Sequence, residues 1–568
     1  MPRHLLWNVS CLLLVALVRS VAAQQGAEAL EGAMAEGERR LQAGDVRGAE
    51  TRYRAALFEG WLLRGTLARI EQQRDAARAA YDKAAAFAIA PEQRRELGAA
   101  YVACGDGARA VDILQPLAKD LPGDVPLRRL LVRALAATGE AERAARELAA
   151  LGAAAEADPE TAFVVATEFL WLKRPDEAER FFARLRKARP LPQTRVIIGH
   201  AYRDAGEYDR ARHELEGALV QEPKLRRAHY TLASVLLADA SLGPERRARA
   251  IAEYREELKL APDDAQTCDA LGLELLDAGS ADEALALFES AARGEPRASY
   301  VAHVGRAQLA LGRPAEAAAW LRRALELTRT QPVGDADREK IHYQLGLAAR
   351  KVGAAAEAAE NFAAARQLAS RWNAPLRSGG EAEASAGPFV ATALTEESPL
   401  ASLAPEGRGE LRRRVSGALT RACFNLAVIQ AQGEHFDDAA TLLDEAAAID
   451  PDFPNLHYSL GVARFKAGRF AAAVEPLARA LAASPADPWL RRALALAALN
   501  SGGYARAAEL LKDDPERAAD PSLEFSYGLA LAGCHRAGEA RQLFERLRAQ
   551  HGSTPELEAA LRRLNEQR

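Results

Sequence analysis

Residues 193–224 read QTRVIIGHAYRDAGEYDRARHELEGALVQEPK, and this stretch decides the fold. Apolar and small residues recur in it at helical spacing, in two blocks of about a dozen residues each. Gly206 interrupts the pattern where a turn with positive φ is expected, and Pro223 ends the second block because proline cannot continue a helix. Gly199 and Ala211 lack bulk, so the stretch predicts two closely packed helices joined by a short turn.

The same unit recurs along the chain. An alanine equivalent to Ala211 occurs fourteen times, mostly 33 or 34 residues apart. These positions are Ala49, Ala77, Ala110, Ala144, Ala178, Ala211, Ala250, Ala284, Ala317, Ala358, Ala439, Ala473, Ala507 and Ala540. Self-similarity at this period indicates a repeat array, in which each unit buries its apolar face against its neighbours.

This pattern resembles the tetratricopeptide repeat, a helix–turn–helix unit of about 34 residues. Good matches begin at Leu97-Gly98, Leu271-Gly272 and Leu460-Gly461, and about fourteen units cover nearly all of Ala27–Ala549. The resemblance implies an all-α fold, a TPR α-solenoid that winds as a right-handed superhelix. The family's tryptophan near the start of the first helix is mostly absent. The first two units are only 28 residues apart, which predicts a distorted opening repeat.

Residues 1–23 are predicted to be a signal peptide. Arg3 precedes the apolar run Leu12–Val18, and Val21-Ala22-Ala23 before Gln24 is a small-x-small cleavage pattern. We therefore expect a periplasmic or secreted protein; an uncleaved anchor and lipidation at Cys11 are the alternatives. No later apolar stretch approaches the roughly 18 residues of a membrane span.

The repeats fall into two groups along the sequence. Residues 24–370 are predicted to hold about ten repeats, 371–409 a flexible linker, 410–549 about four repeats and 550–568 a C-terminal capping helix. The linker contains Ser378-Gly379-Gly380 and Pro388, and repeat signals stop in it. It is interpreted either as a hinge or as a segment whose apolar Phe389-Val390 docks into a groove as an internal ligand.

Composition and motifs argue against catalysis. Removal of residues 1–23 would change the net charge from −4 to −6, which argues against nucleic-acid binding by the whole chain. No nucleophile elbow, phosphate-binding loop or HExxH motif is present, and we expect no enzyme activity, cofactor or metal. Cys104, Cys268, Cys423 and Cys534 lie in widely separated repeats, so they are interpreted as packed thiols.

Tetratricopeptide repeats bind partners along their first helices, which line a concave groove. The positions that the resemblance assigns to this groove carry eleven bases and only four acids, Glu160, Asp204, Asp269 and Asp277. Aromatic residues, including Trp489, lie among the bases. The candidate binding residues are Arg203, Arg227, Tyr230, Arg306, Tyr343, Arg350, Lys351, Arg421, Phe424, Asn425, Tyr458, Lys466 and Arg492. Arginine and aromatic residues are enriched at binding hot spots, although an arginine-rich composition would give the same bias.

The sequence therefore predicts a non-catalytic, exported scaffold that binds protein or peptide partners, acidic ones among them. The resemblance to repeat proteins of the bacterial envelope implies a role in assembling an envelope complex. The alternatives are an accessory protein for polysaccharide export or glycan transfer, whose aromatic residues would contact sugars, and a purely structural spacer.

Overall fold

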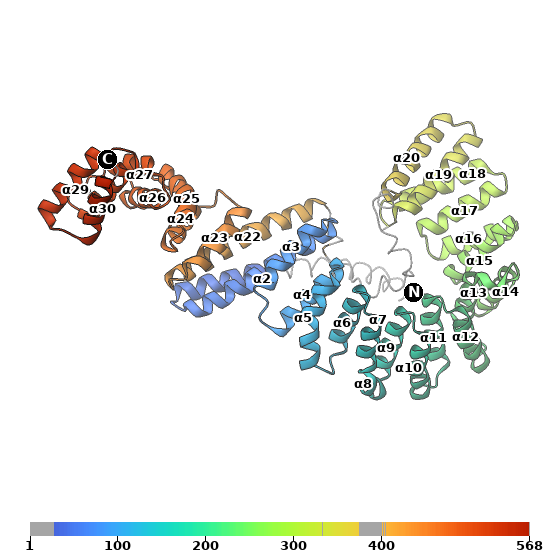
Figure 1. Cartoon of the computed structure of the whole chain (residues 1–568). Helices are drawn as coiled ribbons and strands as arrows, with labels where there is room; N and C mark the ends of the chain where they lie inside the picture. Colours follow the sequence, from blue (N-terminus) through green and yellow to red (C-terminus); the bar gives the residue numbers. More distant parts are fainter. Residues whose placement is uncertain (1–27, 332, 374–399, 401–402, 404, 567–568) are drawn as a thin grey trace. The chain divides into compact units, whose positions relative to one another are not determined.

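The computed structural model describes residues 28–331, 333–373, 400, 403 and 405–566, and within them all regular structure is helical. The predicted signal peptide and most of the predicted linker, including Phe389-Val390, lie outside these residues. Successive helices pair as the first and second helices of repeats (Figure 1). The all-α repeat array expected from the sequence is confirmed.

The helices group into two compact units. Unit 1 joins Met1–Asp120 with Glu396–Arg568, and unit 2 is Leu121–Thr395. Besides the helical residues 28–42, unit 1 contains α2 (Val46–Ile70), α3 (Arg74–Ala85), α4 (Pro91–Cys104), α5 (Gly107–Asp120), α22 (Pro405–Gln432), α23 (Phe436–Ile449), α24 (Leu456–Lys466), α25 (Phe470–Ala483), α26 (Pro488–Asn500), α27 (Tyr504–Lys512), α28 (Pro521–Gly533), α29 (Ala537–His551) and α30 (Pro555–Glu566).

In its described residues, unit 2 consists of consecutive repeats. It contains α6 (Val125–Ala137), α7 (Ala141–Ala149), α8 (Gly152–Ala157), α9 (Pro159–Trp171), α10 (Pro175–Ala188), α11 (Pro192–Ala205), α12 (Tyr208–Gln221), α13 (Ala228–Ala238), the 3-10 helix η1 (Ala240–Leu242), α14 (Glu245–Leu260), α15 (Ala265–Asp277), α16 (Ala281–Gly294), α17 (Ala298–Ala310), α18 (Pro314–Leu327), α19 (Asp335–Lys351) and α20 (Ala355–Asn373). The extra residues 239–244 of the seventh repeat form η1 and its flanking turn.

Aspartate and proline residues begin several of these helices, and glycine ends others. The carboxylates of Asp158 and Asp487 accept hydrogen bonds from backbone N–H groups at the starts of α9 and α26, and proline follows each aspartate at the first helical position. Gly206 ends α11 with φ of 83°, a conformation that a residue with a side chain adopts only at a cost. The turn that Gly206 predicted is therefore confirmed.

The repeating alanines form the packing contact of each repeat. All fourteen lie on second helices, and every one has an exposed fraction of 0% except Ala358, at 5%. In nine of the fourteen repeats a glycine stands twelve residues before the alanine, and it faces the large side chain four residues after the alanine. At Gly98 of α4, for example, a Cβ atom would lie 2.4 Å from Leu114 Cδ2 of α5, so no larger residue fits without a shift.

The opening repeats are distorted, as their short spacing predicted. Helix α2 is 25 residues long because no turn separates the second helix of repeat 1 from the first helix of repeat 2. Its first half carries Ala49 and Tyr53, and its second half carries Gly65, which faces Tyr81 of α3.

The C-terminal repeats pack on the N-terminal ones within unit 1. Helix α22 lies beside α2 (Figure 1), although more than 300 residues separate them in the sequence. The expectation that each repeat contacts only its neighbours in the sequence is therefore wrong at this place. The period of the sequence predicts contacts inside and between consecutive repeats. It cannot predict the contact between α2 and α22, which lie in repeats far apart in the sequence.

Candidate partner-binding surface

The candidate residues lie on first helices in both units. In unit 2 they come from α11, from α13 with the residue before it, and from α17 and α19; in unit 1 they come from α22, α24 and α26. The two sets are therefore two surfaces, one in each unit. The candidate residues differ in how many ion pairs and hydrogen bonds their side chains already form within the protein.

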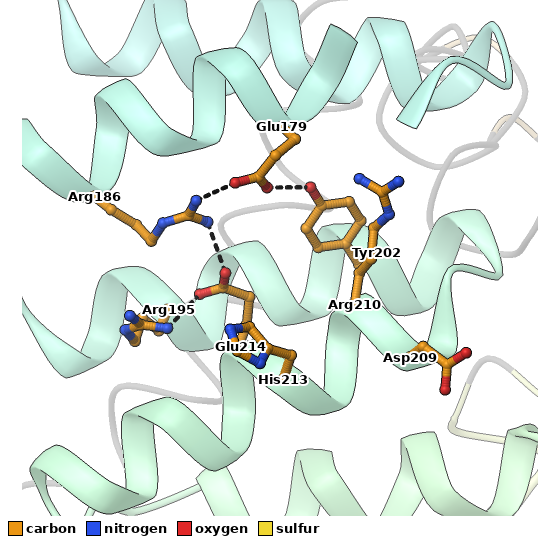
Figure 2. Close-up of a pocket in the computed structure, with 8 residues that line it drawn as sticks. All are labelled: Glu179, Arg186, Arg195, Tyr202, Asp209, Arg210, His213 and Glu214. Carbon is orange, nitrogen blue, oxygen red and sulfur yellow. Dashed lines mark hydrogen bonds and ion pairs between the residues drawn. The ribbon is translucent and has the colours of Figure 1, made fainter. Parts of the chain in front are cut away.

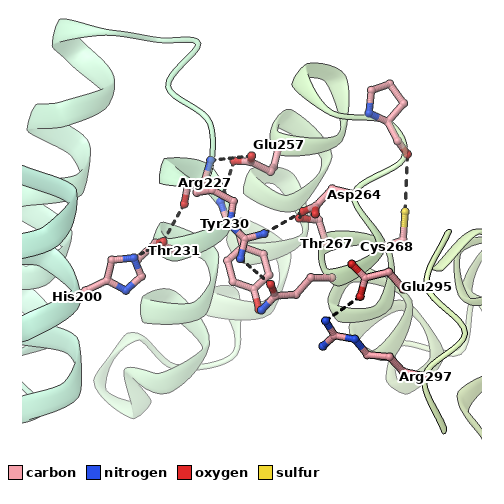
Figure 3. A network of polar contacts seen from close by, with 12 residues as sticks. His200, Arg227, Tyr230, Thr231, Glu257, Asp264, Thr267, Cys268, Glu295 and Arg297 are labelled. Atoms are coloured by element: carbon pink, nitrogen blue, oxygen red, sulfur yellow. Dashed lines mark hydrogen bonds and ion pairs between the residues drawn. The ribbon is translucent and has the colours of Figure 1, made fainter. Parts of the chain in front are cut away.

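Arg227 and Tyr230 form part of a structural network at the start of α13 (Figure 3). The buried carboxylate of Glu257, from α14, accepts a 2.7 Å hydrogen bond from the backbone N–H of Arg227 and a 3.3 Å one from that of Tyr230. The Arg227 guanidinium pairs with Asp264 at 3.0 Å, donates to Gln266 at 2.7 Å and stands 4.3 Å from the centre of the Tyr230 ring. These contacts join α13 to α15, so the Arg227 guanidinium already has partners within the protein.

Three further candidate arginines are also paired with acids. Their ion pairs are Arg203–Asp204 at 2.8 Å, Arg306–Asp277 at 2.8 Å and Arg492–Asp514 at 2.8 Å, the last joined by Glu516 at 2.7 Å. Hydrogen bonds from Arg492 lower the pKa of Asp514, and the two acids raise the pKa of Arg492. Two of the four acids counted in the sequence, Asp204 and Asp277, thus neutralise candidate bases. The groove is less basic than the residue count indicated.

The side chain of Asn425 is engaged in a contact within unit 1. Its side-chain Nδ2 donates a 3.3 Å hydrogen bond to the Tyr53 hydroxyl of α2, within the packing of α22 on α2. The sequence placed Asn425 by its position in the repeat, and that reasoning had no information about a neighbour from the other end of the chain.

The candidate residues of α19 remain accessible. Tyr343 is 49% exposed, and Arg350 and Lys351 are exposed with no acidic partner in the described part of the chain. The Arg350 guanidinium lies 5.8 Å from the centre of the Phe362 ring of α20, and the Tyr343 and Phe362 rings are also 5.8 Å apart. Tyr343 and Phe362 line an open cavity of about 350 Å³, together with Glu339, Ala365, Arg366 and Ala369.

A second accessible group lies on the first helices of unit 1. Tyr458 of α24 and Trp489 of α26 are 42% and 40% exposed, and their ring centres are 6.0 Å apart. Lys466 of α24 and Arg421 of α22 are exposed and form no ion pair with any described residue. Phe424 of α22 is half-buried, with its ring 5.3 Å from that of Phe453.

A polar pocket between α10, α11 and α12 (Figure 2) was not among the sites predicted from the sequence. Arg186 bridges the carboxylates of Glu179 and Glu214, Arg195 contacts Glu214 at 3.1 Å, and the Tyr202 hydroxyl donates to Glu179 at 2.7 Å. Burial opposes ionisation of Glu179, but the hydrogen bonds from Arg186 and Tyr202 outweigh it and lower its pKa. The pocket holds about 360 Å³, yet its charged groups satisfy one another, as in a network that fixes adjacent repeats.

The described residues contain no cluster of three or more side chains that could hold a metal ion. No helix in the same part of the chain is long and apolar enough to cross a membrane. The four cysteines after residue 23 are free thiols, with Cys268 and Cys423 buried and Cys104 and Cys534 half-buried.

Comparison with known proteins agrees with this architecture. One tetratricopeptide repeat model matches residues 198–265, 270–332 and 424–488, and a second matches residues 464–530. With the all-helical fold, these matches identify the chain as a tetratricopeptide repeat protein with multiple repeats. Such repeats form scaffolds for protein–protein interaction and are typically non-catalytic.

Solved structures that match part of the chain include several of MamA. A MamA structure titled "MamA MSR-1 C2" is 22% identical over 32% of this chain and 98% of its own, with a TM-score of 0.27. MamA from Desulfovibrio magneticus RS-1 is 21% identical over 31% of this chain and 97% of its own, with the same TM-score of 0.27. No curated protein matches the sequence. Likeness at this level supports no inference about partners.

Proposed function

We propose that this chain is a non-catalytic scaffold that binds a protein partner on the accessible first-helix surface of unit 1. Tyr458 and Trp489 form the centre of this surface, and Arg421 and Lys466 supply its positive charge. The α19 surface with Tyr343, Arg350 and Lys351 is proposed as a second contact region.

The observation that carries the proposal is which aromatic side chains the fold leaves exposed. Four described aromatic residues are exposed: Tyr343, Tyr458, Trp489 and Tyr504. The first three lie on first helices, at positions that the sequence assigned to the groove. An exposed aromatic ring forgoes the stabilisation of burial, and tyrosine, tryptophan and arginine are the residue types enriched at binding hot spots.

Unpaired bases on the first helices α22 and α24 favour an acidic partner. Arg421 and Lys466 have no carboxylate to satisfy them in the described residues, so a partner carboxylate could form a charge-assisted hydrogen bond with either. Such contacts are exposed, and salt should therefore weaken binding.

The same pair of rings favours one second candidate, a glycan-binding accessory protein, because neighbouring aromatic rings also stack on sugars. The two candidates differ in what releases the bound material. A protein partner is released by protease treatment and by salt, whereas a glycan is released by a competing oligosaccharide.

The test is capture from an envelope extract on the immobilised chain. The wild type is compared with a Tyr458→Ala/Trp489→Ala variant and with Ile89→Ala, a control that removes an apolar side chain 64% exposed in the same unit but outside the first helices. We expect one protein to be retained by the wild type and the control and lost by the double variant. Equal retention by all three would place the binding surface elsewhere.

Export is part of the proposal. The segment that supports it is residues 1–23, with its apolar run and the Ala23–Gln24 cleavage pattern. N-terminal sequencing of the protein recovered from a periplasmic or secreted fraction should begin at Gln24. A mature protein that still begins at Met1 would contradict the proposed cleavage.

A further inference from the structure

Gly60 of α2 is an exception to the packing rule of the array. Elsewhere the buried first-helix glycines, such as Gly98, face a large side chain sixteen residues further along the same repeat. A Cβ atom on Gly60 would instead lie 2.6 Å from Leu419 Cδ2 of α22 and 3.6 Å from Leu30 Cδ1. Gly60 stands where α2 runs from repeat 1 into repeat 2 without a turn, so the long helix offers α22 an uninterrupted surface.

The contact excludes water at its centre. Leu419 and Leu30 are 0% and 1% exposed, and Cys423, one turn after Leu419, is 0% exposed. Burial raises the pKa of the Cys423 thiol to about 12. The side chains around Gly60 are therefore packed to the density of a core, and the contact is more than an incidental touch between surfaces.

Polar contacts surround this apolar centre. Each joins a residue from the N-terminal repeats to one from α22 or α23. They are Arg414–Glu31 at 2.8 Å, Gln430–Glu50 at 3.1 Å, Asn425–Tyr53 at 3.3 Å, Arg412–Glu71 and Lys83–Glu445. Polar pairs that surround a dry centre are the arrangement of a specific protein–protein interface, in which the centre gives affinity and the rim fixes the register.

We propose that α22–α30 form a docking module whose partner is the N-terminal repeats of the same chain, and that the α2–α22 contact holds the module without help from the connecting chain. Residues 121–395, which connect the two parts in sequence, belong to unit 2, and none of the three atoms nearest to a Cβ atom on Gly60 comes from their described part. The surface with Tyr458 and Trp489 is then carried by a module attached through side-chain contacts. The interpretation of the linker as a hinge between independent arrays makes the opposite prediction.

The test uses the full chain with a protease site inserted between Gly379 and Gly380, outside the described residues. The protein is folded first, cleaved, and then examined at about 1 μM by size-exclusion chromatography with mass measurement. We expect both fragments to elute together, one copy of each, with the mass of a single chain. Separation of the cleaved wild-type fragments would overturn the proposal, and so would a mass of two chains, because the contact would then join separate molecules.

Matched glycine substitutions link the result to the contact. Gly60→Leu forces a side chain into Leu419 and should separate the cleaved fragments, with dissociation at least about tenfold faster. Gly417→Leu is the control, because Gly417 is exposed on α22 and a Cβ atom there has no neighbour within 4 Å. Leu419→Ala removes the contact without adding bulk and should act in the same direction if Gly60→Leu fails to fold. Equal dissociation of Leu419→Ala and Gly417→Leu would refute the assignment.

Discussion

Gly98→Ala should destabilise the protein even though alanine is the better helix former. The new Cβ atom would lie 2.4 Å from Leu114 Cδ2 and 2.6 Å from Leu114 Cγ, well inside the ordinary contact distance. Overpacking of this kind costs about 1–3 kcal/mol, and the gain in helix propensity offsets about 0.5–1 kcal/mol of it. We expect a net loss of about 1–2 kcal/mol in the free energy of unfolding.

In a Leu114→Ala background, Gly98→Ala should stabilise the protein instead of destabilising it. All three of the nearest atoms belong to the Leu114 side chain, so its removal leaves room for the methyl group. Leu114→Ala alone should cost about 2–5 kcal/mol, and adding Gly98→Ala should then stabilise by about 1 kcal/mol. Urea unfolding followed by circular dichroism gives the four free energies, and hydrogen exchange in α4 and α5 checks that the change is local. A neutral or stabilising Gly98→Ala in the wild-type background would refute the packing rule.

Two further predictions concern buried charges. Glu168→Ala should lower the free energy of unfolding by about 3 kcal/mol, because it leaves Arg129 and Arg133, 2.9 and 3.1 Å from the carboxylate, without their acid. Glu142→Ala breaks an ion pair whose carboxylate is 76% exposed, and it should cost less than about 1 kcal/mol in the same urea titration. Arg492 lowers the pKa of Asp514 in the folded protein. The ion pair between them therefore stabilises the fold above the unfolded-state pKa of about 3.9, and this stabilisation is lost as the pH falls through the folded-state pKa. The stability difference between the wild type and Asp514→Asn should therefore shrink between pH 6 and pH 3; a difference that does not change with pH would contradict this.

The repeat architecture could be predicted because its physics is local. The alanine of each unit, such as Ala211, meets a first helix only a dozen or so residues away in sequence, so the constraint recurs with the period of the unit. Even the distorted start was visible, since 28 residues between Ala49 and Ala77 leave no room for a turn, and α2 is continuous.

The electrostatics of the surface could be predicted only in part. Position in the repeat located Arg227 and Arg492, but their partners Asp264 and Asp514 lie 37 and 22 residues away, outside the positions counted for the groove. The docking of α22 on α2 could not be predicted at all, because residues such as Gly60 and Leu419 share no repeat and no local pattern. The hydrogen bond between Asn425 and Tyr53 could not be predicted for the same reason.

The dissociation constant of the captured partner for the purified chain tests the central claim most directly. The account predicts that Tyr458→Ala/Trp489→Ala weakens binding by about 2–4 kcal/mol, on the order of a hundredfold, because two neighbouring hot-spot rings are lost while helicity is retained. Ile89→Ala should leave the constant unchanged. An unchanged constant for the double variant would contradict the claim that unit 1 binds its partner through the exposed rings of its first helices.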